Sequence, residues 1–170
     1  EGTIKLMDTS ALSSMCMESE TVRFLPIIRT RYRILVTYPV VREYSHPGRD
    51  LTESERNEAF RDHRLSKVIA ILRRRLSYIG PGETSCIAAS LLLTSDGVDN
   101  YLVLDDQKAR KAAKRAESLD EIVDLLGAPV TLKVTGTIGL IRHLYERGCI
   151  DAEQMHIARE ELKKNGFRAR

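Results

Sequence analysis

Tryptophan is absent from this sequence and other aromatic residues are scarce, with six tyrosines and three phenylalanines in 170 residues. This scarcity argues against a base-stacking platform for single-stranded nucleic acid. Cysteine is scarce as well, and the three cysteines show no close pairing. An odd, unpaired set argues against a disulfide framework or a zinc site, and it favours a reduced, cytoplasmic setting.

Long apolar runs are also missing. None approaches the ~20 residues that a membrane span needs, and no signal-peptide pattern opens the chain, so we expect no membrane partner. The 42% of hydrophobic residues suits a single domain over residues 1–170 with a sizeable core. The net charge of +3 permits an anionic partner without requiring one.

Short apolar segments alternate with helical patterns along the whole chain. We expect strands at 3–7, 33–36, 76–79, 102–104 and 130–134. This alternation predicts an α/β fold, namely a doubly wound, mostly parallel five-stranded sheet with helices on both faces.

Capping signals predict where several helices begin. Capping boxes occupy 52–55 and 118–121, and the first is expected to open one long helical stretch reaching Leu76. Asp151, with Gln154 three residues on, predicts the start of the last helix, which Gly166 should end.

Acidic residues recur where strands end or helices begin. Asp8 ends the first strand and Asp105 with Asp106 ends the fourth, while Glu43 and Glu83 lie in early turns of the helices after strands two and three. In a parallel sheet these positions share one edge, where ligands bind. Oxygen-only ligands favour Mg²⁺ or Mn²⁺, which can activate water and stabilise a phosphodiester in reaction.

Each acid also has a plainer interpretation. Asp8 could be a turn residue, Asp106 a helix cap, and Glu43 and Glu83 simple partners of helix dipoles. Adjacent residues at a strand end point in opposite directions. We therefore expect one member of the Asp105–Asp106 pair to bind the metal and the other to cap the helix starting at Gln107, with Asp105 the expected ligand.

Polar residues near the same edge are candidates for substrate binding. Thr9, Ser10 and Thr137 carry hydroxyls able to bond a phosphate, although such residues are more often plain helix caps. Lys108 and Arg110 are placed to contact substrate phosphates, and Arg110 could equally pair with a neighbouring acid.

Five motifs, in this order, resemble the PIN-domain family. They are DTSAL at Asp8, VVRE at Glu43, PGE at Glu83, LVLDDQKAR around Asp105 and VTGTIGLI from Val134. The ending, ERGCIDAEQ followed by ELKKNGFR, is similar to the PIN-like subgroup found beside toxin–antitoxin genes. The resemblance covers nearly the whole chain, with a helical insertion around 48–76.

The resemblance implies a Mg²⁺- or Mn²⁺-dependent ribonuclease that hydrolyses RNA phosphodiester bonds. Such proteins are often the toxin of a pair with an antitoxin protein, and they are usually homodimers. Carried over residue by residue, the metal-binding and catalytic acids would be Asp8, Glu43, Glu83 and the Asp105–Asp106 pair. One departure is that Glu83 stands where many members carry an aspartate further along a helix.

Two other functions compete with this one. A non-catalytic RNA- or protein-binding module on the same fold remains the main alternative. A phosphatase with Asp8 as nucleophile commonly shows a second aspartate two residues on, and that position is Ser10 here. The homodimer is also suggested by apolar residues of the last two helices, namely Ile141, Leu144, Met155 and Leu162.

Overall fold

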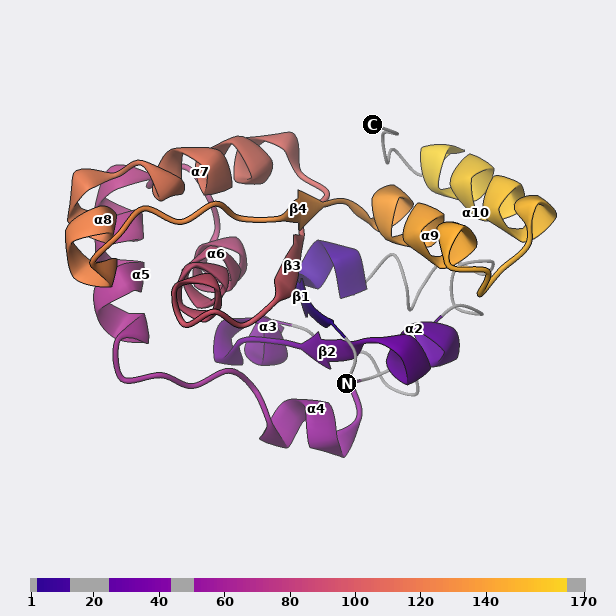
Figure 1. Ribbon diagram of the computed structural model, residues 1–170, viewed down its shortest axis with the longest axis horizontal. Helices are drawn as coiled ribbons and strands as arrows, with labels where there is room; N and C mark the ends of the chain where they lie inside the picture. The colour runs from indigo at the N-terminus through magenta and orange to yellow at the C-terminus, as the bar shows by residue number, and fades with distance from the viewer. Residues whose placement is uncertain (1–2, 13–24, 44–50, 165–170) are drawn as a thin grey trace.

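The computed structural model of the chain describes residues 3–12, 25–43 and 51–164 (Figure 1). Its sheet has four parallel strands in the order β2-β1-β3-β4. The strands are β1 (Ile4–Met7), β2 (Arg33–Leu35), β3 (Asn100–Val103) and β4 (Val134–Thr135). The predicted α/β fold with a parallel sheet is therefore confirmed.

Helices cover both faces of the sheet, which Figure 1 shows nearly edge-on. On one side α6 (Pro81–Ser95) contacts β1 and β3, with α5 (Leu65–Arg75), α7 (Gln107–Glu117) and α8 (Asp120–Leu126) outside it. On the other side lie α2 (Leu25–Arg31), α9 (Thr137–Glu146) and α10 (Ala152–Lys164). The described part also has two short helices, α3 (Tyr38–Glu43) and α4 (Glu53–Asn57), and a helical segment at residues 9–12.

Helix α6 is the central helix of the molecule. Its residues from Thr84 to Leu92 are all buried, because the sheet lies on one side and α5 and α7 lie on the other. Pro81 is tolerated at its first turn, where the missing N–H has no partner to lose. Since α6 leads into a parallel strand, it runs antiparallel to the sheet and begins at the carboxyl edge.

The expected strand at 76–79 is not formed, so the sheet has four strands rather than five. Residues 77–79 are a turn and a bend between α5 and α6. Leu76 is buried, and its N–H donates to the carbonyl of Leu72, which continues the hydrogen-bonding pattern of the preceding helix. The last strand is also shorter than expected, because only Val134 and Thr135 pair with β3.

The expected long helix from Thr52 to Leu76 is broken into α4 and α5. Between them, the Phe60 N–H donates to the Val36 carbonyl at 2.8 Å, which draws the chain toward the sheet. Asp62 Oδ1 then accepts from the Arg64 N–H at 2.8 Å, a local turn that competes with helix. The guanidinium of Arg64 lowers the pKa of Asp62 to about 2 and so stabilises this turn.

The capping predictions have mixed outcomes. The box at Thr52 and Glu55 is confirmed in both directions, and Asp151 and Gln154 form the same reciprocal pair at α10. The box at 118–121 is wrong, because Leu119 occupies the N-cap of α8 without a side-chain bond. The Ser118 hydroxyl donates instead to the Arg115 carbonyl. Gly166 lies outside the described residues.

The last two helices use their apolar faces within the chain itself. Ile141, Leu144 and Leu162 are fully buried, so they do not supply the surplus packing surface that suggested a homodimer. The exposed apolar side chains on these helices are Tyr145 and Ile157. No helix in the described part of the chain is long and apolar enough to cross a membrane.

Candidate metal centre

The predicted carboxylates gather at the carboxyl edge of the sheet. Asp8 follows β1, and Asp105 and Asp106 follow β3. Because these strands are parallel neighbours, their ends lie side by side. Glu83 lies at the same edge because it is in the first turn of α6. The strand expected at 76–79, which is not formed, is not needed to place it there.

One cavity of about 110 Å³ lies among these groups. Its lining residues are Asp8, Thr9, Ser10, Glu43, Gly80, Gly82 and Glu83. The structure therefore brings together, from three separate segments, three of the predicted acids and two of the predicted hydroxyls. Asp105 and Asp106 are not part of this lining, although their charges act on it.

Asp8 is the most deeply buried of the acids, with 2% of its surface exposed. Burial, with a smaller contribution from the charges of Asp105, Glu83 and Asp106, raises the pKa of Asp8 to about 7. The Ala11 N–H opposes this by donating to Asp8 Oδ1 at 2.8 Å. Among the described residues, this one hydrogen bond does not compensate for the burial and repulsion of the Asp8 carboxylate, so its neutral form is favoured.

Glu43 and Glu83 complete the acidic lining. Burial raises the pKa of Glu83, with Asp106 and then Glu43 as charged neighbours. Thr9 Oγ1 donates to Glu43 Oε2 at 2.7 Å, which ties the end of α3 to the residue after Asp8. These acids are therefore close enough to influence one another.

Gly82 is a residue of this site that the sequence reasoning did not single out. A Cβ at Gly82 would lie only 2.7 Å from Glu43 Oε2, so the missing side chain makes room for that carboxylate. The glycine of the PGE motif, directly before Glu83, is the signal that points to such a close approach.

Asp105 is engaged by the start of α9. Its Oδ1 accepts from the Thr137 N–H at 2.6 Å, and its Oδ2 accepts from Thr137 Oγ1 at 2.7 Å. Burial raises the pKa of Asp105, while these two bonds and the charge of Arg110 oppose the rise. Both carboxylate oxygens of Asp105 thus hold Thr137, which ties β3 to α9.

Asp106 caps α7, as expected for one member of the pair. Its Oδ2 accepts from the Ala109 N–H at 3.0 Å. The side chain is exposed, and its charge raises the pKa of both Asp8 and Glu83. Asp106 therefore lies close enough to the acidic cavity for its charge to act on two of the lining acids.

The predicted substrate-binding residues fall into two groups. Thr9 and Ser10 line the cavity and Lys108 is exposed on the first turn of α7. Arg110 is 8% exposed, and its Nη2 donates to the backbone carbonyl of Asp105 at 3.1 Å. Its charge also acts on the Asp105 carboxylate, in line with the alternative that Arg110 pairs with a neighbouring acid. Thr137 is fully buried against Asp105, so it acts as a structural partner there.

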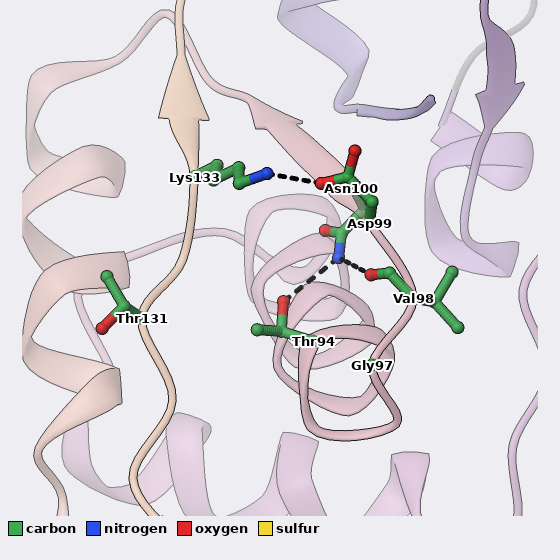
Figure 2. A pocket seen from close by; sticks show the side chains of 7 residues that line it. All are labelled: Thr94, Gly97, Val98, Asp99, Asn100, Thr131 and Lys133. Carbon is green, nitrogen blue, oxygen red and sulfur yellow. Dashed lines mark hydrogen bonds and ion pairs between the residues drawn. The ribbon is translucent and has the colours of Figure 1, made fainter. Parts of the chain in front are cut away.

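A second, larger pocket of about 240 Å³ lies at the amino end of β3 (Figure 2). There the Asn100 amide donates to Thr94 Oγ1 and to the Val98 carbonyl, and Lys133 donates to Asp99 Oδ1 at 2.5 Å. These polar groups satisfy one another. Asp99 is the acid of this lining, and it already holds Lys133.

The donor chemistry of the carboxyl edge fits a divalent cation. Asp8, Glu43, Glu83 and Asp106 offer oxygen ligands, and a cation would relieve the repulsion that raises the pKa of Asp8 and Glu83. Within the described ranges no three His, Cys, Asp or Glu side chains converge on one ready-made ion site. Glu43 and Asp106 are exposed, so their side chains have room to turn toward a cation.

Comparison with known proteins places the chain in a family. A family model described as a PIN domain matches residues 4–170. No curated protein and no solved structure gives a match. PIN domains are generally nucleases that use divalent metals. The family match, the parallel sheet and the order of the acids agree, and the chain belongs to the PIN-domain family.

Proposed function

We propose that this protein is a Mg²⁺- or Mn²⁺-dependent endoribonuclease. The observation that carries the proposal is the cavity at the carboxyl edge, where Asp8, Glu43 and Glu83 meet with Asp106 beside them. Asp8 is buried among carboxylates that repel it, and such a group destabilises the fold unless a cation or a proton compensates for its charge. Such an arrangement is typical of a site that binds metal for phosphodiester hydrolysis.

The metal, when bound, would stabilise the negative charge that develops on the phosphodiester and would favour ionisation of water. Asp8, Glu43, Glu83 and Asp106 are the residues proposed to hold it. Thr9 orients Glu43 through its hydroxyl, and Ala11 orients Asp8 through its N–H. Asp105 positions the end of β3 by holding Thr137.

A titration of metal against a mixed single-stranded RNA tests the proposal. The native protein should cleave internally only with Mg²⁺ or Mn²⁺. Asp8→Asn should reduce cleavage by more than roughly a hundredfold, since losses of up to a hundredfold are typical of residues that only orient ligands. RNA that is bound but never cleaved, under any metal condition, would favour the non-catalytic binding module instead.

We propose two further properties on the basis of the resemblance. The first is that the protein is a toxin whose partner is an antitoxin protein, and the second is that it forms a homodimer. For the homodimer, the exposed Tyr145 on α9 and Ile157 on α10 offer apolar contact surface, at 41% and 42% exposure. The homodimer can be tested first, because its partner is a second copy of the same chain.

A further inference from the structure

Helix α7 carries a row of cations that begins beside the acidic cavity. Asp106, its N-cap, lies next to Glu83 in charge interaction, and Lys108, Lys111 and Arg115 follow along the exposed side. At 3.6 residues per turn these three positions lie within about 60° of one another around the axis. They span roughly 10 Å of helix, at 1.5 Å per residue.

The opposite side of α7 explains why this row faces outward. Ala109, Ala112, Ala113 and Ala116 are fully buried. Small side chains let the helix pack closely onto α6 and α8, so the longer cationic side chains have no place in the core. The row is therefore held on a rigid element at a defined distance from the acids.

Several cations elsewhere on the described surface have an acidic partner, whereas this row has none among the described residues. Arg64 pairs with Asp62 and Asp96, and Lys133 pairs with Asp99. On α7 itself, Lys114 pairs with Glu117 at 3.2 Å. Within the part of the chain that the structure describes, no carboxylate pairs with Lys108, Lys111 or Arg115, which leaves three like charges to repel one another.

We infer that Lys108, Lys111 and Arg115 form a phosphate track, along which single-stranded RNA runs as it leaves the acidic cavity. The inference rests on the proposed function, because it takes RNA as the substrate. Consecutive phosphates along the strand supply the missing counter-charge, and the contacts carry no sequence information. The track holds the strand in register while the acidic cavity near the start of α7 binds the phosphodiester to be cleaved.

Binding of a fluorescein-labelled, mixed-sequence single-stranded RNA, measured by anisotropy in EDTA, tests the track without any cleavage. Lys111→Gln and Lys114→Gln form a matched pair, since both remove one exposed lysine charge from α7 and glutamine preserves helix propensity. Lys111→Gln should weaken binding several-fold and lower the salt slope by about 0.7, the single-strand value per phosphate. Lys114→Gln should leave both quantities unchanged.

A second comparison controls for net charge. The triple variant with glutamine at Lys108, Lys111 and Arg115 should lose roughly tenfold or more in affinity and about 2 in salt slope. Glutamine at Arg73, Arg74 and Arg75 removes the same charge from the end of α5, where Arg74 and Arg75 already bind Glu121, and should have little effect. Equal losses in the two triple variants, or no RNA binding by the native protein, would overturn the track. If the RNA affinities and salt slopes change as expected but the native protein does not cleave RNA when Mg²⁺ or Mn²⁺ is added, only the nuclease proposal would be overturned.

Discussion

At the scale of single residues, the two adjacent aspartates have separable roles. Asp105 holds Thr137 through both carboxylate oxygens, and Asp106 caps α7 while its charge acts on Asp8 and Glu83. Because both oxygens of Asp105 are already engaged by Thr137, we propose Asp106 as the member of the pair that binds metal, while the sequence-based expectation for Asp105 stays a prediction. Asp105 then serves to position the two segments that meet at Thr137.

Conversion of each aspartate to asparagine should separate these roles. Asp106→Asn preserves the cap, because asparagine caps as well as aspartate, yet it should abolish metal-dependent RNA cleavage with little change in the melting temperature without metal. Asp105→Asn should lower cleavage about ten- to hundredfold and should also lower the melting temperature, because the charge-assisted bonds to Thr137 are replaced by weaker neutral ones. Unchanged cleavage in both variants would refute the assignment of this edge as the catalytic site.

Lys5 is a buried charge whose removal should stabilise the protein. It is 1% exposed, and its Nζ lies 3.8 Å from the Tyr101 ring centroid and 4.5 Å from that of Tyr32. Burial lowers the pKa of Lys5 to about 8, with Arg147 adding repulsion. Below that pH the ammonium is charged in a site that disfavours the charge. The fall of the pKa from 10.5 to about 8 corresponds to a destabilisation of the folded state by up to about 3 kcal/mol.

Lys5→Met should therefore raise the free energy of unfolding at pH 7 by about 1–2 kcal/mol, once the lost contact with the tyrosine rings is subtracted. The native protein should itself gain stability as the pH rises from about 8 toward 10.5, since the folded state releases its proton first. Urea unfolding at several pH values measures both effects. A less stable methionine variant at pH 7 would contradict this account of Lys5.

At the scale of elements, the approach of α3 to α6 depends on Gly82. Alanine there would improve helix propensity by up to about 1 kcal/mol, but its Cβ would displace Glu43 from the cavity. Gly82→Ala should thus keep or slightly raise the melting temperature without metal and reduce the stabilisation by Mn²⁺. Differential scanning fluorimetry with and without Mn²⁺ measures both.

Gly80→Ala is the matched control for this substitution. Gly80 precedes the same helix, has extended backbone angles, and has nothing within 4 Å of an added Cβ. Its variant should respond to Mn²⁺ as the native protein does. Equal losses of the Mn²⁺ response in the two variants would show that Glu43 does not depend on the space at Gly82.

At the scale of the whole molecule, metal binding should stabilise the fold by mass action. When the free metal concentration is a hundred times the dissociation constant, the free energy of unfolding rises by about 2.7 kcal/mol. This gain raises the melting temperature of a chain of this size by roughly 5–10 °C. Asp8→Asn should remove most of this shift and should raise the melting temperature without metal, because a buried repelling charge is gone. A metal-induced shift of full size in Asp8→Asn would argue for binding elsewhere.

The homodimer gives a second prediction at this scale. Sedimentation velocity at micromolar concentration should show a dimer, and Ile157→Glu on α10 should convert it to monomer by placing a charge at an apolar contact. Val98→Glu is the control, since Val98 is similarly exposed, at 39%, in the connection between α6 and β3. A native protein that sediments as a monomer would rule out the dimer under these conditions.

The sequence by itself determined the local features of this protein. Alternating apolar segments determined the parallel sheet, and Asp8 and Asp105 had to follow β1 and β3 wherever those strands formed. The caps at Thr52 and Asp151 followed directly from residues three apart. The caps depend on hydrogen bonds between near neighbours in the chain, whose geometry a short sequence largely specifies, and the sheet class follows from the alternation of strand and helix patterns.

Tertiary structure decided what the edge residues contact. The 76–79 segment became a turn because α5 leads straight into α6, and the helix expected through Phe60 broke because Phe60 bonds to Val36. The bond of Asp105 to Thr137 and the space that Gly82 leaves for Glu43 join residues more than 30 positions apart. Such contacts depend on how whole elements pack, because each is made only after distant segments have already been brought together.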